Sequence, residues 1–299
     1  MTPESLSWHP HLDAWLVVGA LLGGYLYALA VWGPRHAPGQ RPATGRQRLY
    51  FVLGVAALWA GADWPVHTLA DSLFSVHMLQ HTLFALVAAP LLILGTPGWL
   101  LRRLLRPRPV FATVRFVTRP LVALAIFNAW VAAYHWPALV NLSVRHDAFH
   151  AAAHAVWVTT ALVMWWPVLS PLPELPHLSY PARMLYLFAQ SIVPTVPASF
   201  LTFGQQPLYR VYEATTAPWG LSVVTDQQIA GLLMKIGGGL LLWSVIAVLF
   251  FRWSYEEETG GPDILYWRDL EPGLATAGKT AGAQGPPPGG DPEPGSGTP

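Results

Sequence analysis

Two histidines stand four residues apart at the start of a long apolar stretch, HMLQHTLFALVAAPLLILGTP (77–97). In a helix, His77 and His81 lie about 6 Å apart along one face. Lipid penalises imidazole, so polar side chains at membrane depth usually face the interior of a helix bundle. Neutral imidazole nitrogens are good ligands for copper and zinc. The spacing therefore indicates metal binding inside a membrane protein.

Other histidines repeat this spacing at the ends of further apolar stretches. We predict that the metal ligands are His77, His81, His150, His154, His135 and His146. Carboxylate and amide side chains are expected to hold the free nitrogens of these rings; the candidates are Asp63, Gln80, Asp226, Gln227 and Gln228. Nothing in the sequence places His9, His11 and His67 on a shared face, and we interpret them as solvated near the head groups.

The residue types limit the chemistry. The chain has no cysteine, so a thiolate metal site is excluded. A histidine-dominated site suits Cu(II) or Zn(II), or Cu(I) held by two or three imidazoles. The segment 77–81 has the spacing of a zinc metalloprotease helix but lacks the glutamate that acts as base. We find no phosphate-binding loop and no nucleic-acid-binding module, and we expect neither an enzyme nor a nucleic-acid partner.

The composition shows which elements must position these histidines. Of 299 residues, 53% are hydrophobic and only 11% are charged, against about 25% charged in globular proteins. A crossing helix needs about 20 largely apolar residues. We therefore predict an all-α polytopic membrane protein, a bundle of seven transmembrane helices. The predicted spans are 14–33, 47–62 with flanks, 73–95, 119–135, 149–169, 182–203 and 228–251.

Arginine distribution predicts the orientation of the bundle. The loop 34–48 contains four arginines and the loop 96–119 contains six, whereas 63–72 has no Lys or Arg. Basic loops stay in the cytoplasm and contact acidic lipid, so the N-terminus should lie outside and the C-terminus in the cytoplasm. Residues 1–255 then form the transmembrane domain. The Gly- and Pro-rich segment 256–299 is expected to be a disordered cytoplasmic tail.

Three ordered blocks resemble one known family. The stretch LFSVHMLQHTLFALVAAPLLILGTP (73–97) is similar to the signature of the polytopic CtaG-type cytochrome c oxidase assembly factors. YHWPALVNLSVRHDAFHAAAHAVWVTTALVMWWPVL (134–169) and PLYRVYEATTAPWGLSVVTDQQIAGLLMK (207–235) resemble its second and third blocks. Lys235 departs from the pattern, which has an apolar or aromatic residue there.

The resemblance implies a multi-pass protein of the bacterial plasma membrane that helps to assemble haem–copper cytochrome c oxidase. Copper is the implied metal, and subunits of the oxidase are the implied partners, besides membrane lipid. The resemblance matches His77, His81, His150 and His154 to the family's histidine motifs and 226–228 to its Asp-Gln-Gln motif.

Three other functions remain open from the sequence. A membrane b-type cytochrome would use histidines on different helices, such as His81 and His154, as axial haem ligands. A transporter would use the polar cluster as a vestibule and would need polar groups along the rest of its path. The predicted cytoplasmic halves of the spans are almost wholly apolar, which counts against it. A scaffold would hold oxidase subunits without binding metal.

Overall fold

The structure is a computed structural model that describes residues 11–36, 41–216 and 219–260. Within these ranges the chain is all-helical and has no strands. The chain divides into two units, residues 1–251 and 252–299, and the site described below belongs to the first. Most of the predicted disordered tail, from residue 261 on, lies outside the described residues, as does His9.

Five helical stretches are long and apolar enough to cross a membrane: Leu12–His36, Phe74–Gly95, Asp147–Leu169, Tyr180–Phe203 and Val223–Thr259. The stretch α8 (Arg108–Val117) with α9 (Pro120–Tyr134) passes the same test as a pair bent by 79°, which gives up to six. The predicted second span corresponds to α3 (Gly45–Ala62), which is helical but outside this set. Seven crossings and the orientation of the termini therefore stay predictions.

Three of the five long stretches contain several elements each. The first comprises α1 (Leu12–Tyr27), η2 (Ala28–Trp32) and α2 (Gly33–His36); the second comprises α5 (Phe74–Thr82), η3 (Leu83–Ala88) and α6 (Ala89–Gly95). Then α11 (Asp147–Leu169) and α12 (Tyr180–Phe203) are single helices, and α14 (Val223–Leu232), η6 (Leu233–Gly238) and α15 (Gly239–Gly260) complete the last. Shorter helices join them: α4 (Val66–Ala70), α7 (Gly98–Leu104), α10 (Pro137–Arg145), η4 (Arg210–Tyr212) and α13 (Glu213–Thr216).

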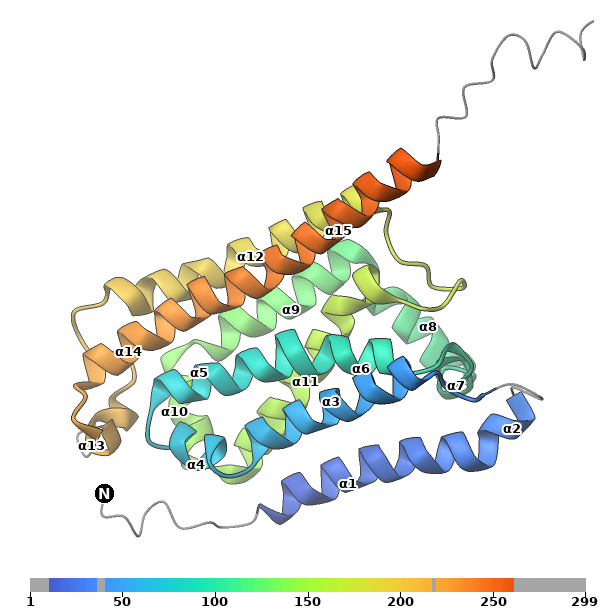
Figure 1. Ribbon diagram of the computed structural model, residues 1–299. Helices are drawn as coiled ribbons and strands as arrows, with labels where there is room; N and C mark the ends of the chain where they lie inside the picture. The colour runs from blue at the N-terminus through green and yellow to red at the C-terminus, as the bar shows by residue number, and fades with distance from the viewer. Residues whose placement is uncertain (1–10, 37–40, 217–218, 261–299) are drawn as a thin grey trace, which may run out of the picture. The chain divides into compact units, whose positions relative to one another are not determined.

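Two helices that carry histidines, α5 and α11, lie side by side in the middle of the first unit (Figure 1). Helix α11 packs against α9, α6 and η3, while α14 packs against both α5 and α12. The N-termini of α5 and α11 are at the same end of the unit, which we call the histidine end. Residues at both starts can therefore meet.

The helix α3 begins and packs for reasons visible in the sequence. The Thr44 hydroxyl accepts from the Gln47 amide over 3.1 Å, and the Gln47 side chain accepts from the Thr44 amide over 2.9 Å, a capping box. Helix α3 packs against α6 where Gly95 of α6 lies directly against Phe51 of α3. A Cβ added to Gly95 would collide with the Phe51 backbone. A small residue here lets α3 and α6 approach closely.

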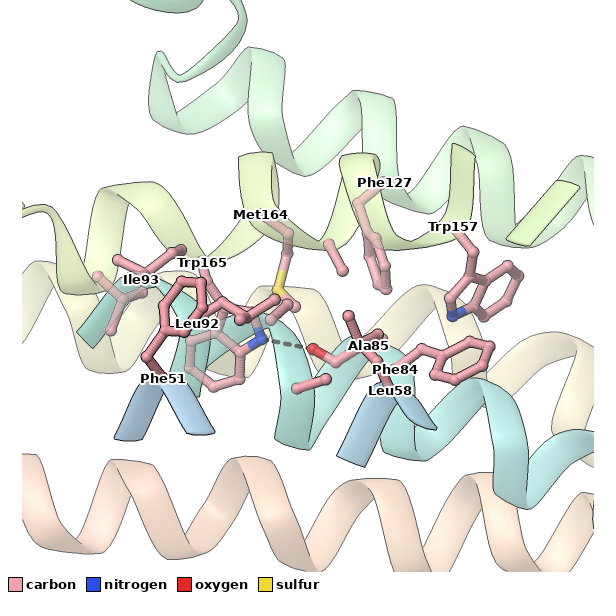
Figure 2. Packing of buried hydrophobic residues seen from close by; sticks show 14 of the residues in the cluster. Phe51, Leu58, Phe84, Ala85, Leu92, Ile93, Phe127, Trp157, Met164 and Trp165 are labelled. Carbon is pink, nitrogen blue, oxygen red and sulfur yellow. Dashed lines mark hydrogen bonds between the residues drawn. The ribbon is translucent and has the colours of Figure 1, made fainter. Parts of the chain in front are cut away.

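A π-helical segment, η3, interrupts the helix that carries His77 and His81. The amide of Ala89 bonds to the carbonyl of Phe84, one residue beyond the α-helical partner. In this register the donor for the Ala85 carbonyl would come from Pro90, which has no N–H. The Trp165 indole of α11 donates to that carbonyl instead, over 2.7 Å (Figure 2). A proline-freed carbonyl is thus satisfied by the neighbouring helix.

Candidate metal centre

Four histidines form one cluster, His77 and His81 on α5 with His150 and His154 on α11; we call these four residues the histidine cluster. One ring nitrogen from each of His77, His81 and His154 lies within 4.8 Å of the other two. The His150 ring lies 4.2 Å from that of His154 and 5.4 Å from that of His77, between centroids. The i, i+4 spacing on both helices puts each pair on one face.

Three of the four rings of the cluster are buried and His154 is partly exposed, and the cluster is rich in unpaired nitrogens. His77 is 1% exposed, His81 3% and His150 6%. Nδ1 of His77, both ring nitrogens of His81 and Nε2 of His150 and His154 are buried and have no hydrogen-bond partner. A buried polar group without a partner costs about 1–3 kcal/mol. Donating their lone pairs to a metal ion would satisfy several of these nitrogens at once.

Two tryptophans of α11 fix its register against the histidine helix. Trp157 donates to the backbone carbonyl of His81 over 3.1 Å, and Trp165 donates to that of Ala85 over 2.7 Å. The Trp157 indole also stacks on the His81 ring, with centroids 4.0 Å apart. These anchors hold His150 and His154 opposite His77 and His81. Sequence reasoning missed both, because a buried tryptophan on an apolar helix looks like any other core residue.

A buried tyrosine orients one of the rings. The Tyr134 hydroxyl, 0% exposed as a residue, lies 3.4 Å from Nε2 of His77 and 2.8 Å from the Ser143 hydroxyl. Engaging Nε2 leaves Nδ1 of His77 as the nitrogen available to a metal. Hydrogen bonds of this kind set which nitrogen of a ligand ring is used. The sequence placed no role on Tyr134.

The Asp-Gln-Gln motif (226–228) lies at the histidine end, but its side chains form hydrogen bonds with the backbone and with the Ser75 hydroxyl, and not with the imidazole rings of the cluster. Asp226 of α14 accepts from the amides of Phe74 and Ser75 over 2.6 and 3.2 Å, and from the Ser75 hydroxyl. Leu73, the N-cap residue of α5, has no side-chain acceptor, so Asp226 caps the helix from another part of the chain.

The two glutamines of the motif hold the chain that precedes α14. Gln227 accepts from the Leu208 amide over 2.6 Å and donates to the Gln206 carbonyl over 3.4 Å, and Gln228 donates to the Gly204 carbonyl over 3.2 Å. The three side chains therefore position helices and the loop between them. Direct support of the ligand rings by this motif, predicted above, stays a prediction.

Of the histidines interpreted as solvated, His67 lies against the cluster and His11 lies against His67. The His67 ring of α4 lies 4.1 Å from that of His11 and 5.6 Å from that of His150, between centroids. Burial, followed by the nearby His11, lowers the pKa of His67 to about 4, so its ring is neutral at pH 7. These contacts join residues that are far apart in the chain, and neither spacing nor periodicity signals them.

The two predicted polar partners near His67 have different surroundings. Gln80 donates to the Gly61 carbonyl over 2.6 Å, and its amide nitrogen lies 3.5 Å from Nδ1 of His67. Asp63 is 0% exposed. Its Oδ1 accepts from the His11 amide over 3.4 Å, and Oδ2 has no hydrogen-bond partner.

The remaining predicted ligands, His135 and His146, are not members of the histidine cluster, although Nε2 of His135 is also buried without a hydrogen-bond partner. His135 is buried, and its Nδ1 bonds to the Val131 carbonyl of its own helix over 2.7 Å. It lines a cavity of about 300 Å³ together with His81, Met78, Met164, Met234 and Lys235. The ammonium of Lys235 lies 5.6 Å above the Phe203 ring, a cation–π contact. His146 is exposed at the N-cap of α11. The structure therefore groups four of the six predicted ligands.

The chain matches one protein family and several curated proteins. Residues 25–256 match the family model described as cytochrome c oxidase caa3 assembly factor (Caa3_CtaG). Uncharacterized proteins of Mycobacterium bovis and Mycobacterium tuberculosis are each 24% identical over 225 residues, and one of Mycobacterium leprae is 23% identical over the same length. Each alignment covers 69% of this chain and 34% of the relative, so the chain spans about a third of the length of these curated relatives. No solved structure matches.

Proposed function

Because the chain belongs to the Caa3_CtaG family of cytochrome c oxidase caa3 assembly factors, we propose that it holds a copper ion in the histidine cluster and passes it to an oxidase subunit. The protein would span the bacterial plasma membrane seven times, with the N-terminus and the histidine end outside. The observation that carries the proposal is the convergence of His77, His81 and His154, each offering a nitrogen within 4.8 Å of the others.

The donor set suits copper. Two or three neutral imidazoles without a charged ligand bind Cu(I), and imidazole is also a good ligand for Cu(II). Oxidation of a cysteine ligand is no hazard here because the chain contains none. When bound, copper would be cargo for the oxidase, and the residues of this chain would hold it by ligation and release it by ligand exchange. No catalytic step is part of the proposal.

The geometry favours a single ion over haem. A haem needs its flat macrocycle between two axial rings, which were predicted as His81 and His154. The rings of these two residues have centroids 5.4 Å apart, and the His77 ring lies 4.4 Å from that of His81. Three rings that converge on one point are suited to one small ion. Purified protein should accordingly show no Soret band, and such a band would favour the cytochrome.

The test is oxidase activity in a strain lacking its own factor, grown at limiting copper. We expect the double variant His77→Ala/His81→Ala to be present in the membrane yet to restore little oxidase activity, and to lose copper on purification. The matched control, His36→Ala/His177→Ala, removes two exposed histidines that lie outside the cluster. Full oxidase activity with the cluster variant would refute copper delivery, and unchanged copper content would refute binding at the cluster.

A further inference from the structure

The histidine cluster continues as a row of imidazoles towards the start of the first helix. From His150, the next ring is His67 at 5.6 Å and the last is His11 at 4.1 Å from His67, between centroids. Exposure changes along this row: His150 is buried, whereas His67 and His11 are partly exposed. The row therefore connects the buried ring of His150 with the surface of the histidine end.

A buried carboxylate accompanies the outer pair of rings. Asp63 is 0% exposed, its Oδ1 accepts from the His11 amide, and its Oδ2 has no hydrogen-bond partner. An unpaired carboxylate oxygen in a buried position is costly unless a cation or donor faces it. Imidazole is a ligand that suits copper, and a buried carboxylate beside two imidazoles would offset the positive charge of the ion.

The surroundings favour a cation at this position. Asp13 and Asp147 act electrostatically on both His67 and His150, and Asp71 acts on His150. These three carboxylates are exposed, whereas Asp63 is buried. Exposed carboxylates near a site raise the local concentration of cations and speed their arrival.

We propose that His11 and His67, beside the buried Asp63 carboxylate, form a loading site, a second metal position that receives copper at the surface and transfers it through His150 to the histidine cluster. This inference rests on the proposed function and specifies how the cluster is filled. Transfer is ligand exchange: an imidazole of the next residue adds its lone pair to the ion as a ligand behind it leaves. The oxidation state of copper does not change.

The experiment uses the full chain in detergent with Cu(I) supplied from a coloured chelator. It follows the rate of transfer to the protein and the amount bound at equilibrium. The variants His67→Asn and His11→Asn should load the cluster about tenfold more slowly than the unaltered chain while keeping its tight binding, and should lose a weaker second ion. His146→Asn is the matched control, since His146 lies at the same end but is exposed.

Two outcomes separate the loading site from the cluster. If His67→Asn and His11→Asn both load at the rate of the unaltered chain, or His146→Asn slows loading as much, the loading site is wrong and the cluster stands. If His77→Ala/His81→Ala keeps tight binding, the proposed function is wrong. Should His67→Asn fail to fold, His11→Asn and Asp63→Asn test the same site, because Asp63→Asn keeps an acceptor for the His11 amide and removes the charge.

Discussion

The indole of Trp157 makes two contacts with one residue: its Nε1 donates to the His81 carbonyl over 3.1 Å, and its ring stacks on the His81 imidazole at 4.0 Å between centroids. Backbone and side chain of a proposed ligand are thus held by one side chain on the neighbouring helix. The contact also sets how α11 lies along α5.

The first prediction concerns this contact. Trp157→Phe keeps an aromatic ring but leaves the His81 carbonyl without its indole donor, so we expect the free energy of unfolding to fall by about 1–3 kcal/mol. Copper affinity should fall as well, because His81 loses its fixed position. The control is Trp166→Phe on the same helix, since Nε1 of Trp166 has no hydrogen-bond partner to lose. Thermal unfolding and copper titration in detergent measure both; equal effects from the two variants would contradict the role of Trp157.

The second prediction separates orientation of a ring from general packing. Tyr134→Phe removes the hydroxyl that lies 3.4 Å from Nε2 of His77. Losing a group that orients a metal ligand typically weakens binding about 10- to 100-fold, and we expect the copper Kd to rise within that range. Tyr186→Phe also removes a buried hydroxyl, which donates to the Met164 carbonyl over 2.8 Å, away from the cluster. It should lower stability and leave the copper Kd unchanged; a matching rise in Kd would argue against a specific role for Tyr134.

The third prediction tests the cap supplied from a distant helix. Asp226→Ala leaves the first amides of α5 without their acceptor and should cost about 1–2 kcal/mol of unfolding free energy. Asp226→Asn retains an acceptor oxygen but removes the favourable charge at the helix N-terminus, so its cost should be smaller. Copper affinity should follow stability, because His77 lies in the turn that Asp226 holds.

Ser222→Ala is the comparison for this cap. The Ser222 hydroxyl accepts from the Thr225 amide over 3.0 Å. It is an exposed cap of α14 that comes from the residue directly before that helix, and not from a distant helix. We expect a loss of about 1 kcal/mol with no change in copper affinity. A change of copper affinity in this control comparable to that in Asp226→Ala would mean that the affinity reports stability alone.

The fourth prediction concerns the contact between α3 and α6. Gly95→Ala adds a Cβ where it meets the backbone of Phe51, and overpacking of this kind costs about 1–3 kcal/mol. Gly19→Ala is the control, because a Cβ at Gly19 meets nothing within 4 Å. In a helix interior that change should stabilise by about 1 kcal/mol. The two substitutions should move the melting temperature in opposite directions, and a stabilising Gly95→Ala would show that the helices lie further apart.

Local features of the sequence predicted much of the fold. The family resemblance is confirmed by the match over residues 25–256. The all-helical class is seen throughout the described ranges. Helical spacing also correctly placed His77 beside His81, and His150 beside His154, since neighbours at i and i+4 follow from the helix alone.

Features that depend on packing between distant segments were beyond the sequence. His11 and His67 meet only because α1 and α4 converge at the histidine end. Asp226 was predicted to support the ligand rings, yet its hydrogen bonds run to the start of α5. A local signal did exist there: a leucine at the N-cap of α5 requires an acceptor from elsewhere. Metal binding itself stays a prediction for every ligand.

The π-helical turn couples two positions on different helices, because residue 90 decides whether the Ala85 carbonyl needs the Trp165 donor. With proline at 90, only a donor from outside the helix satisfies the Ala85 carbonyl, and Trp165 is that donor. A lineage that replaced Pro90 first would regain an amide at that position and could then tolerate phenylalanine at 165. In the reverse order, the intermediate would leave a bare carbonyl surrounded by hydrocarbon. The order of the two substitutions therefore decides whether the intermediate carries an unpaired buried carbonyl, at a cost of about 1–3 kcal/mol.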